Sequence, residues 1–346
     1  MTPQLTRLDL KGEPFAIGLG LGLVGRSAVQ RLLLSHPLWA EVNSATHAKA
    51  VARMAETTQV RFHWIWAEIE GLAQGLGLPP LQVFAWNCRG DLLAMAPDGC
   101  TTVMQPGPTI TLAHNEDGFP FFRGQCFLAD LDPDGQPGLT SFAYPGSIVG
   151  HTFAMTHAGL VQTVNNIRLV GVAPEIPRMV LGRAVLACET LDQAVHLLQT
   201  SGPSGGFHFG LAQAGDDRLL SVEFGKGGVS VHRVTAPMAH ANHALHLSQG
   251  QGQIITQSSA DRQLRADDLL HSGHDPLSIL RDAAGPGLPI RRDAQDDPDE
   301  ENTIATLLAQ IGADGVRWAV HPDKGPAILG HIRPAGPNRP SSAHKG

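Results

Sequence analysis

The first hundred residues carry their apolar side chains at helical spacing. Residues 14–36 (PFAIGLGLGLVGRSAVQRLLLSH) predict an amphipathic helix whose start is weakened by three glycines. Residues 41–77 predict one or two further helices, and the Gly-Leu-Pro-Pro sequence at 77–80 ends the last of them. Residues 81–95 (LQVFAWNCRGDLLAM) predict a short buried helix or strand. The front third of the chain is therefore expected to be rich in helix.

After residue 100 the pattern changes to short runs of Thr, Val, Ile and Phe, which Gly and Pro interrupt. Such runs are typical of strands joined by hairpins. A small-residue break at 156–159 and turns such as Ala313-Asp314-Gly315 separate neighbouring strands. Strands are expected within residues 100–105, 109–117, 125–132, 147–171, 208–234 and 302–321.

Helical spacing returns between these strands. Residues 177–200 predict a pair of amphipathic helices, and residues 258–272 predict another helix. Many strands with several surface helices indicate an α+β architecture built in layers. The polar stretch 282–302, which contains Pro and Gly, is long enough to suggest a functional loop. The Pro-rich tail, residues 332–346, is expected to be disordered.

The composition supports a folded chain. Of 346 residues, 42% are hydrophobic and 16% are charged, which is typical of a globular protein with a substantial core. The formal net charge of −7, without a large Lys/Arg cluster, argues against a nucleic-acid partner. The amino terminus lacks the pattern of a signal peptide, and the apolar run at 15–25 is too short and too Gly-rich to cross a bilayer. We therefore expect a cytoplasmic protein with no membrane partner.

Four cysteines in a chain of this length do not indicate a disulfide scaffold, and no two of them form a CxxC pair. A structural zinc site is therefore not expected. Among the 17 histidines, the candidate metal ligands are two close pairs, His240 with His243 and His151 with His157. Since neither HExxH nor a comparable pattern with a carboxylate accompanies them, no metal site is predicted.

One cysteine differs from the others in its surroundings. Cys88, Cys126 and Cys188 lie within apolar runs and are expected to fill the core. Cys100 follows Gly99 in the sequence PDGCTT, and glycine lets the backbone beside the thiol adopt strained conformations. Attack of the Cys100 thiol on the Gly99 carbonyl, followed by hydrolysis, would make Cys100 a new amino terminus. Its α-amino group, with an unperturbed pKa of roughly 7.7–8.0, would then be the base for its own thiol.

Segments spread along the chain form a set of motifs. They are GEPFAIGLGLGLVG at 12–25, NCRGDL at 87–92, DGCTT at 98–102, HNED at 114–117, GLVQTVNNIRLVG at 159–171, HANHAL at 240–245, SSADRQLRADDLL at 258–270, PIRRD at 289–293 and the hairpin at 302–320. In this order they resemble the acyl-coenzyme A:6-aminopenicillanic acid acyltransferase (isopenicillin-N acyltransferase) family of N-terminal-nucleophile (Ntn) hydrolases. The resemblance covers nearly the whole chain.

The resemblance implies a four-layer αββα sandwich, in which two mostly antiparallel sheets pack together between layers of helices. It also implies self-cleavage between Gly99 and Cys100. Residues 1–99 would be the helix-rich segment released from the precursor by the cut, and residues 100–331 would be the catalytic segment. The two segments would form an α/β heterodimer within one intertwined domain, and a homo-oligomer of this unit stays open.

By the same resemblance, Cys100 is the nucleophile for both self-cleavage and turnover. Asn242 matches an asparagine that stabilises the oxyanion, a role worth roughly 3–4 kcal/mol in the transition state. Asp117 matches a carboxylate near the nucleophile, which would raise the pKa of the terminal amine and orient it. Thr102 matches a hydroxyl beside the scissile bond. Each has a structural alternative, because Asp117 could form an Asx-turn, Asn242 could cap a turn, and Thr102 is favoured in strands.

Further residues are expected to bind the substrate because they lie on matching segments. They are Asn165, Asn166, Phe119 and Arg292. Where the family has aromatic residues around its Asn-x-Asp element, this chain has the polar His114 and Glu116. The site is therefore expected to be more polar and to accept a different acyl group. Arg262 and Arg265 lie three residues apart on one predicted helix face and are interpreted as structural ion-pair partners.

The leading hypothesis is a self-processing enzyme that hydrolyses or transfers the acyl group of a small N-acyl amide or peptide-like substrate through a thioester on Cys100. Hydrolysis is slightly favoured over transfer. No cofactor is required, and a coenzyme A thioester is the alternative co-substrate, which would make the protein an N-acyltransferase. The rival from another class is a non-catalytic, unprocessed binding protein on the same scaffold.

Overall fold

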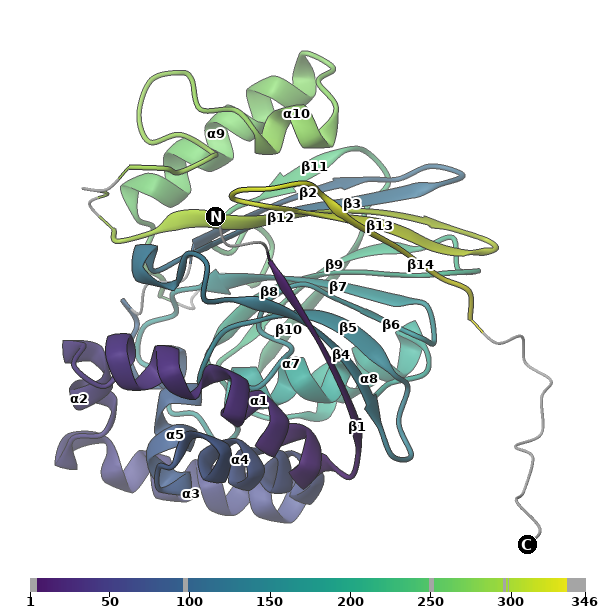
Figure 1. The fold of residues 1–346 in the computed structure, drawn as a ribbon. Coiled ribbons are helices and arrows are strands. Elements are labelled where there is room, and N and C mark those ends of the chain that lie inside the picture. Colours follow the sequence, from purple (N-terminus) through teal and green to yellow (C-terminus); the bar gives the residue numbers. More distant parts are fainter. Residues whose placement is uncertain (1–4, 96–98, 249–251, 295–296, 298, 335–346) are drawn as a thin grey trace, which may run out of the picture.

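Two β-sheets pack face to face and helices cover their outer faces (Figure 1). The computed structural model describes residues 5–95, 99–248, 252–294, 297 and 299–334. Within these residues one sheet has the strand order β1-β4-β5-β6-β7-β8-β9-β10, and the other has the order β11-β2-β3-β12-β13-β14. This arrangement is the αββα sandwich, so the expected fold class is confirmed.

The larger sheet contains strands from both sides of residue 99. Its neighbouring strands are antiparallel except for β1 and β4, which run parallel with Thr6 beside Phe127. Its strands are β1 (Thr6–Gly12), β4 (Phe127–Pro133), β5 (Leu139–Ala143), β6 (Ala154–Thr156), β7 (Leu160–Ile167), β8 (Gly206–Gln213), β9 (Leu219–Gly225) and β10 (Gly228–Arg233).

The smaller sheet has Cys100 near the start of an inner strand. Its pairs are all antiparallel, and β2 lies between β11 and β3. Its strands are β2 (Gly99–Gln105), β3 (Ile110–Gly118), β11 (Met238–His240), β12 (Asn302–Gly312), β13 (Gly315–Pro322) and β14 (Ile328–Ile332).

The helices form the two outer layers. Figure 1 shows α9 and α10 over the smaller sheet and the remaining labelled helices on the far side of the larger one. No helix of the described residues is long and apolar enough to span a membrane. The helices are α1 (Pro14–Ala28), α2 (Pro37–Val42), α3 (Ala45–Arg61), α4 (His63–Leu76), α5 (Pro80–Asn87), α6 (Arg89–Leu92), α7 (Arg178–Val185), α8 (Leu191–Thr200), α9 (Gln257–His271) and α10 (Pro276–Leu280), with a π-helical extension of α1, η1 (Val29–Leu33), and a 3₁₀ turn, η2 (Pro120–Phe122).

Most of the elements expected from the sequence are present. Residues 81–95 form the helices α5 and α6 rather than a strand. Four strands lie outside the expected ranges, namely β1, β5, β11 and β14. The tail was also expected to begin too early, because Ile332 ends β14 and is buried. The rest of the expected tail, residues 335–346, lies outside the described residues.

The side chains of β2 alternate between two environments because successive residues of a strand point to opposite faces. Met104 packs into the large core between the two sheets, with Leu112 of β3. Val103 packs into a smaller cluster under α9 and α10, with Ala113. Cys100, which has the same parity as Met104, therefore faces the space between the sheets.

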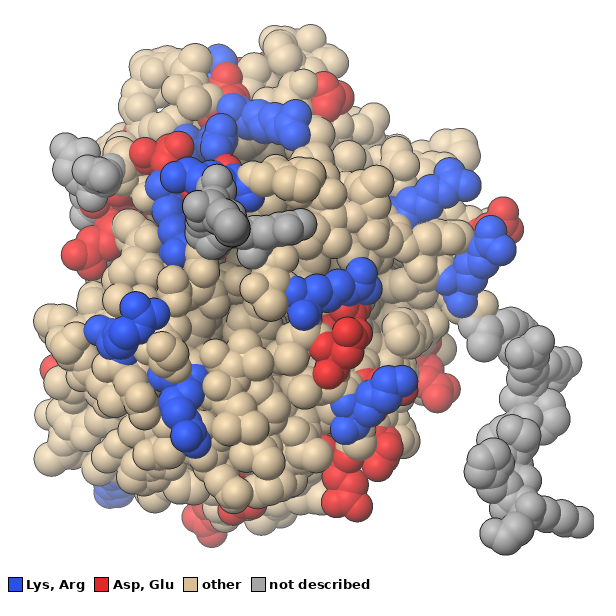
Figure 2. Space-filling model, in the orientation of Figure 1, with Lys and Arg blue, Asp and Glu red and all other residues tan. Residues whose placement is uncertain are grey.

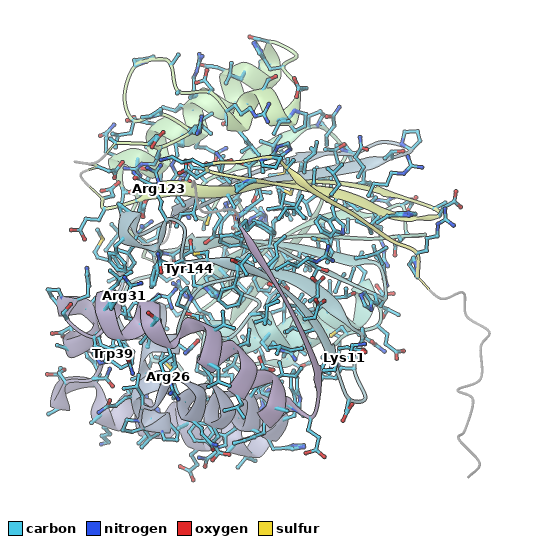
Figure 3. The ribbon with its side chains drawn as sticks, in the orientation of Figure 1. Lys11, Arg26, Arg31, Trp39, Arg123 and Tyr144 are labelled. Atoms are coloured by element: carbon cyan, nitrogen blue, oxygen red, sulfur yellow. The ribbon has the colours of Figure 1, made fainter. Side chains whose placement is uncertain are left out.

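The helices α1 and α4 pack closely because glycines line their contact. A Cβ atom at Gly18 would lie 1.9 Å from the main-chain oxygen of Glu68, and one at Gly22 would lie 2.3 Å from that of Leu72. Arg26 near the end of α1 (Figure 3) donates from Nε to the main-chain oxygen of Gly75 at 2.6 Å. The glycines that weaken this helix in the sequence thus allow backbone-to-backbone contact.

Ion pairs attach β1 to β4. Arg7 of β1 pairs with Asp130, and Nζ of Lys11 (labelled in Figure 3) lies 3.6 Å from Oδ2 of Asp132. On the face drawn in Figure 2, basic and acidic side chains lie interspersed rather than in a single field. These exposed pairs add little stability individually, so the parallel ladder and the packed helices hold the first segment to the second.

Candidate active site around Cys100

Strands on both sides of β2 bring polar groups to Cys100. The register of β3 places Glu116 opposite Cys100 and Asp117 opposite Gly99. On the other side, β11 pairs with β2 and leads directly to Asn242. Cys100 is only 3% exposed, so the thiol of the uncut chain is closed off from solvent.

Asn242 holds the nitrogen of the Gly99–Cys100 peptide. Its Oδ1 accepts the main-chain N–H of Cys100 at 2.9 Å and an N–H of Arg262 at 2.6 Å. Its Nδ2 donates to the main-chain oxygen of Asn166 at 3.1 Å. These partners fix the orientation of the amide, since Oδ1 faces donors and Nδ2 faces an acceptor. The oxyanion role, which needs an N–H of Nδ2, stays a prediction.

Arg262 reaches from α9 to the carbonyl side of Cys100. Its Nη1 donates to the main-chain oxygen of Cys100 and, at 2.9 Å, to Oγ1 of Thr101. The direct hydrogen bonds of Arg262 thus go to β2 and Asn242, while the carboxylates of Asp117 and Glu301 act on it through their charges. The interpretation as a structural ion-pair partner is confirmed for Arg265, whose Nη2 lies 2.9 Å from Oδ1 of Asp282.

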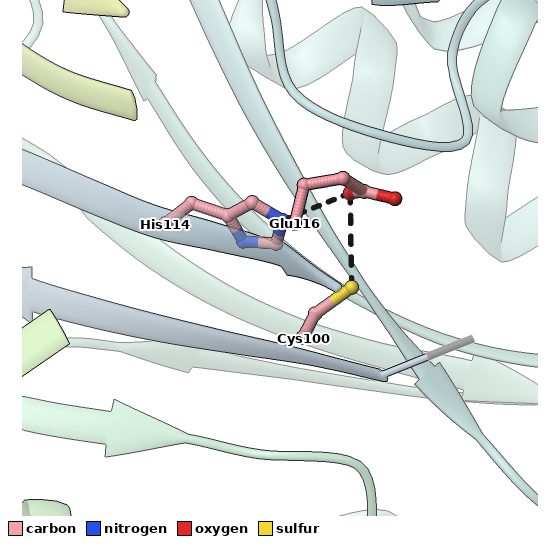
Figure 4. Close-up of side chains that lie close together, drawn as sticks. All are labelled: Cys100, His114 and Glu116. Atoms are coloured by element: carbon pink, nitrogen blue, oxygen red, sulfur yellow. Dashed lines mark hydrogen bonds and ion pairs between the residues drawn. The ribbon is translucent and has the colours of Figure 1, made fainter. Parts of the chain in front are cut away.

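A buried chain of polar groups begins at the thiol (Figure 4). Oε2 of Glu116 lies 3.7 Å from Sγ of Cys100 and 3.3 Å from Nε2 of His114. Oγ1 of Thr102 lies 2.8 Å from Nδ1 of His114 and 2.6 Å from Oδ1 of Asn165, which belongs to β7 of the facing sheet. Burial lowers the pKa of His114 to about 3, so its imidazole is neutral near pH 7. The chain connects the cysteine to both sheets.

Two carboxylates flank Gly99. A Cβ atom at this position would lie 2.3 Å from Oε2 of Glu301 and 3.3 Å from Cβ of Asp117, so the site requires glycine. Oδ1 of Asp117 accepts the hydroxyl of Thr303 at 2.6 Å. Burial raises the pKa of Asp117, and the charge of Arg262 opposes this shift. Asp117 therefore lies beside Gly99, as its expected role near the nucleophile requires, but that role is still a prediction.

Arg292 holds the second carboxylate in place. Its Nη1 lies 2.9 Å from Oε2 of Glu301, and its other nitrogens bond to Asp297. Arg168 lies 3.0 Å from Oε1 of the same glutamate. Burial raises the pKa of Glu301 to about 7, while Arg168, Arg262 and Arg292 oppose the shift. In this state Arg292 orients a carboxylate beside Gly99, and its substrate-binding role stays a prediction.

The other expected substrate-binding residues lie around the same centre. Phe119 follows β3, is buried, and stacks on Phe121 with ring centroids 4.8 Å apart. Asn166 accepts a hydrogen bond from Arg178 at its side chain and from Asn242 at its main chain. Both positions border the site, and contact with a substrate stays a prediction.

The site also contains a set of potential metal ligands. Sγ of Cys100, a ring nitrogen of His114 and a carboxylate oxygen of Glu116 all lie within 4.8 Å of one another. Thiolate, imidazole and carboxylate are donors that a borderline-soft cation such as Zn²⁺ accepts. The histidine pairs considered in the sequence did not point to this set, because it forms only when β2 and β3 pair.

A cavity of about 520 Å³ opens elsewhere, on β12, β13 and β14, and is lined by residues such as Trp318 and Leu329. None of its lining residues belongs to the group around Cys100. This cavity therefore lies apart from the polar group around Cys100.

The contacts of four site residues were not predicted. His114 and Glu116 were expected only to make the site more polar, although residues two apart on a strand share a face and Glu116 lies next to Asp117 in the HNED motif. Arg262 lay in a recognised motif, but its contact with Cys100 was not predicted. Glu301 gave no signal, since it lies about two hundred residues from the glycine it contacts.

Comparison with known proteins supports the resemblance. The sequence model of the acyl-coenzyme A:6-aminopenicillanic acid acyl-transferase family matches residues 103–324, well over half of the chain. A search of curated proteins finds no match. The family match begins three residues after Cys100, so the assignment of the nucleophile depends on the geometry described above.

Proposed function

Because the chain belongs to the acyl-coenzyme A:6-aminopenicillanic acid acyl-transferase family, it is an enzyme of the acyltransferase type, and we propose that it is a self-processing cysteine enzyme of the Ntn class. The observation that carries the proposal is the set of buried polar groups at the Gly99–Cys100 bond. Asn242 holds the nitrogen of Cys100, and Gly99 lies against Glu301 and Asp117. Arg262 holds the carbonyl of Cys100, one peptide bond further along the chain. These contacts support a bond that is positioned for reaction.

In the proposed first reaction, Sγ of Cys100 attacks the carbonyl carbon of Gly99. The C–N bond breaks as the C–S bond forms, and water then hydrolyses the thioester. The new α-amine of Cys100 becomes the base for later turnovers. Oδ1 of Asn242, which accepts the N–H of Cys100 in the uncut chain, is placed to accept an N–H of that amine.

In the proposed second reaction, the freed thiol accepts an acyl group from a small amide or peptide-like compound. Transfer of the acyl group to water gives hydrolysis, and transfer to an amine gives an N-acylated product. Hydrolysis of an amide is the favoured outcome, and a coenzyme A thioester is the alternative acyl donor. The charged and polar neighbours Glu116, His114 and Arg168 favour a substrate with polar groups near its carbonyl.

The proposal is tested by the mass of the purified protein. The wild-type chain is expected to yield two fragments, residues 1–99 and 100–346, whereas Cys100→Ala stays whole. Alkylation with iodoacetamide should then label Cys100 at the new amino terminus. A wild-type chain that stays whole for days under native conditions would support the rival, an unprocessed binding protein, and overturn the proposal.

A further inference from the structure

Self-cleavage needs a base that the uncut chain does not yet have. The α-amine that serves the processed enzyme is still the peptide nitrogen of Cys100, which donates its hydrogen to Asn242 and has no basic lone pair. Some other group must therefore take the thiol proton for the first reaction. Oε2 of Glu116, 3.7 Å from Sγ, is within reach of that proton.

Hydrogen-bond partners determine where the protons of this network lie. Nδ2 of Asn165 donates to the main-chain oxygen of His240 at 3.0 Å, so Oδ1 of Asn165 is the atom that faces Thr102. The amide oxygen can only accept, and the hydroxyl of Thr102 therefore donates to it at 2.6 Å. Having used its only hydrogen, Oγ1 of Thr102 accepts from Nδ1 of His114.

This tautomer of His114 determines whether Nε2 faces Glu116 with a hydrogen or with a lone pair. With its hydrogen on Nδ1, a neutral imidazole presents the lone pair of Nε2 to Oε2 of Glu116, 3.3 Å away. A carboxylate facing that lone pair would be repelled, so one proton must lie between the two atoms. Both side chains are buried, and an ion pair between them would have to be desolvated, so the neutral form with the resting proton on Glu116 is favoured.

We propose that Glu116 and His114 form a proton relay that activates the Cys100 thiol for self-cleavage. The inference rests on the proposed self-processing and names the groups that carry it out. Oε2 of Glu116 takes the thiol proton while passing its own proton to Nε2 of His114, leaving a thiolate beside an imidazolium. The thiolate forms the C–S bond to Gly99, and the relay returns one proton to the departing nitrogen of Cys100 when the C–N bond breaks. The relay then holds a single shared proton again.

The arrangement contains a nucleophile (Cys100), a proton carrier (the Glu116–His114 pair) and a group that orients the carrier. Thr102 and Asn165 orient the imidazole, as the partner of a catalytic histidine does in other cysteine and serine enzymes. Asn165 belongs to the facing sheet, so the relay assembles only when the two sheets have packed. The same three donors could instead bind a metal ion, and the experiment below separates the two readings.

The test measures the rate of self-cleavage after a short pulse of cell-free synthesis, followed by gel and mass analysis. Glu116→Gln keeps the size of the side chain and a hydrogen bond to Nε2 of His114 but cannot pass a proton, and His114→Asn removes the final acceptor. Both are expected to cleave about 10²–10⁴-fold more slowly than the wild type, the usual contribution of acid–base catalysis. The matched control is Glu68→Gln, which neutralises another fully buried carboxylate, paired with Arg183 far from the site; it should cleave at the wild-type rate.

A second measurement separates proton transfer from folding. In D₂O the wild type is expected to cleave more slowly, with a solvent isotope effect that indicates the transfer of two protons. His114→Asn should show the smaller isotope effect of a single proton transfer. Glu116→Asp keeps a carboxylate at shorter reach and should cleave at a rate between those of Glu116→Gln and the wild type. Thermal unfolding of each uncut variant monitors the fold.

The results of this test distinguish a failure of the Glu116–His114 relay from a failure of the proposed self-processing. If the wild type cleaves and Cys100→Ala does not, but Glu116→Gln and His114→Asn both cleave within threefold of the wild type, the relay is wrong and self-processing stands. If EDTA stops wild-type cleavage, the three residues hold a metal and the relay is wrong. If no chain cleaves, self-processing itself fails.

Discussion

His208 supports the site from β8 and contacts the same side-chain oxygen of Asn165 as Thr102 does. Its Nδ1 lies 3.0 Å from Oδ1 of Asn165, and its ring stacks on His240 with centroids 3.6 Å apart. Burial, and secondarily the neighbouring His240, lower its pKa well below the usual value. A buried histidine thus fixes Asn165, which orients the proposed relay, while remaining neutral, and that neutrality makes the stability of the fold depend on pH.

The dependence has a definite sign. Below pH 6.5 the histidine takes up a proton when the chain unfolds but not while it is folded, so the free energy of unfolding falls as the pH falls. His208→Gln should reduce this slope, by at most about 1.4 kcal/mol per pH unit, as the pH falls below 6.5. Urea unfolding at several pH values measures the slope, with the exposed His63→Gln as control. An unchanged slope in His208→Gln would show that the buried ring is protonated in the folded chain.

Among the elements, the contact between α1 and α4 shows that glycines with a low helix propensity can still be needed where two helices pack closely. Gly18 and Gly22 of α1 face Gly71 and Gly75 of α4, and each glycine touches main-chain atoms of the other helix. Helix propensity alone assigns these glycines a cost of about 1 kcal/mol each. Their close contact offsets this cost, since it lets two backbones pack where side chains would separate them.

A larger residue at this contact should therefore destabilise the fold even though it favours the helix. Gly22→Ala would place Cβ 2.3 Å from the main-chain oxygen of Leu72, and overpacking of this kind costs about 1–3 kcal/mol. Differential scanning calorimetry of Gly22→Ala should show a lower Tm than the wild type. Leu23→Ala, on the exposed side of the same helix, should change stability by no more than about 0.5 kcal/mol. A rise in Tm for Gly22→Ala would contradict the packing described here.

At the scale of the whole molecule, the segment before Gly99 is an integral part of the fold. It supplies β1 to the larger sheet and α1 to α6 to one outer layer. Ile17, Leu72 and Phe84 from this segment belong to the same core as Phe142 and Phe209 from the second. A cut between the segments would leave these contacts unchanged.

The two proposed fragments are therefore expected to stay together. After self-cleavage, size-exclusion chromatography should elute both fragments in one peak at the volume of uncut Cys100→Ala. Only a denaturant such as guanidinium should separate them. Elution of residues 1–99 apart from residues 100–346 in native buffer would show that the shared core does not hold the segments.

Local sequence patterns were sufficient to predict the layers of this fold, but not the network of polar contacts around Cys100. Strand-like runs and the PDGCTT motif placed β2 and its cysteine correctly, because both depend on neighbours in the sequence. The contacts of Glu301 and Arg262 with Gly99 and Cys100 were not predicted because they arise from long-range packing. Strand β1 was missed for another reason. Its polar and apolar residues do alternate, but only Leu8 and Leu10 are apolar and neither is fully buried, because the strand lies at the edge of its sheet.

The position of Glu301 has a consequence for the order of events during synthesis. Gly99 lies against the carboxylate of Glu301, about two hundred residues later in the chain and directly before β12, the strand that pairs with β3. A ribosome must therefore have added residue 301 before the surroundings of the Gly99–Cys100 bond are complete. The proposed cut would then occur only after most of the chain has folded. A chain truncated before residue 301 would keep its Gly99–Cys100 bond and would not acquire a second amino terminus.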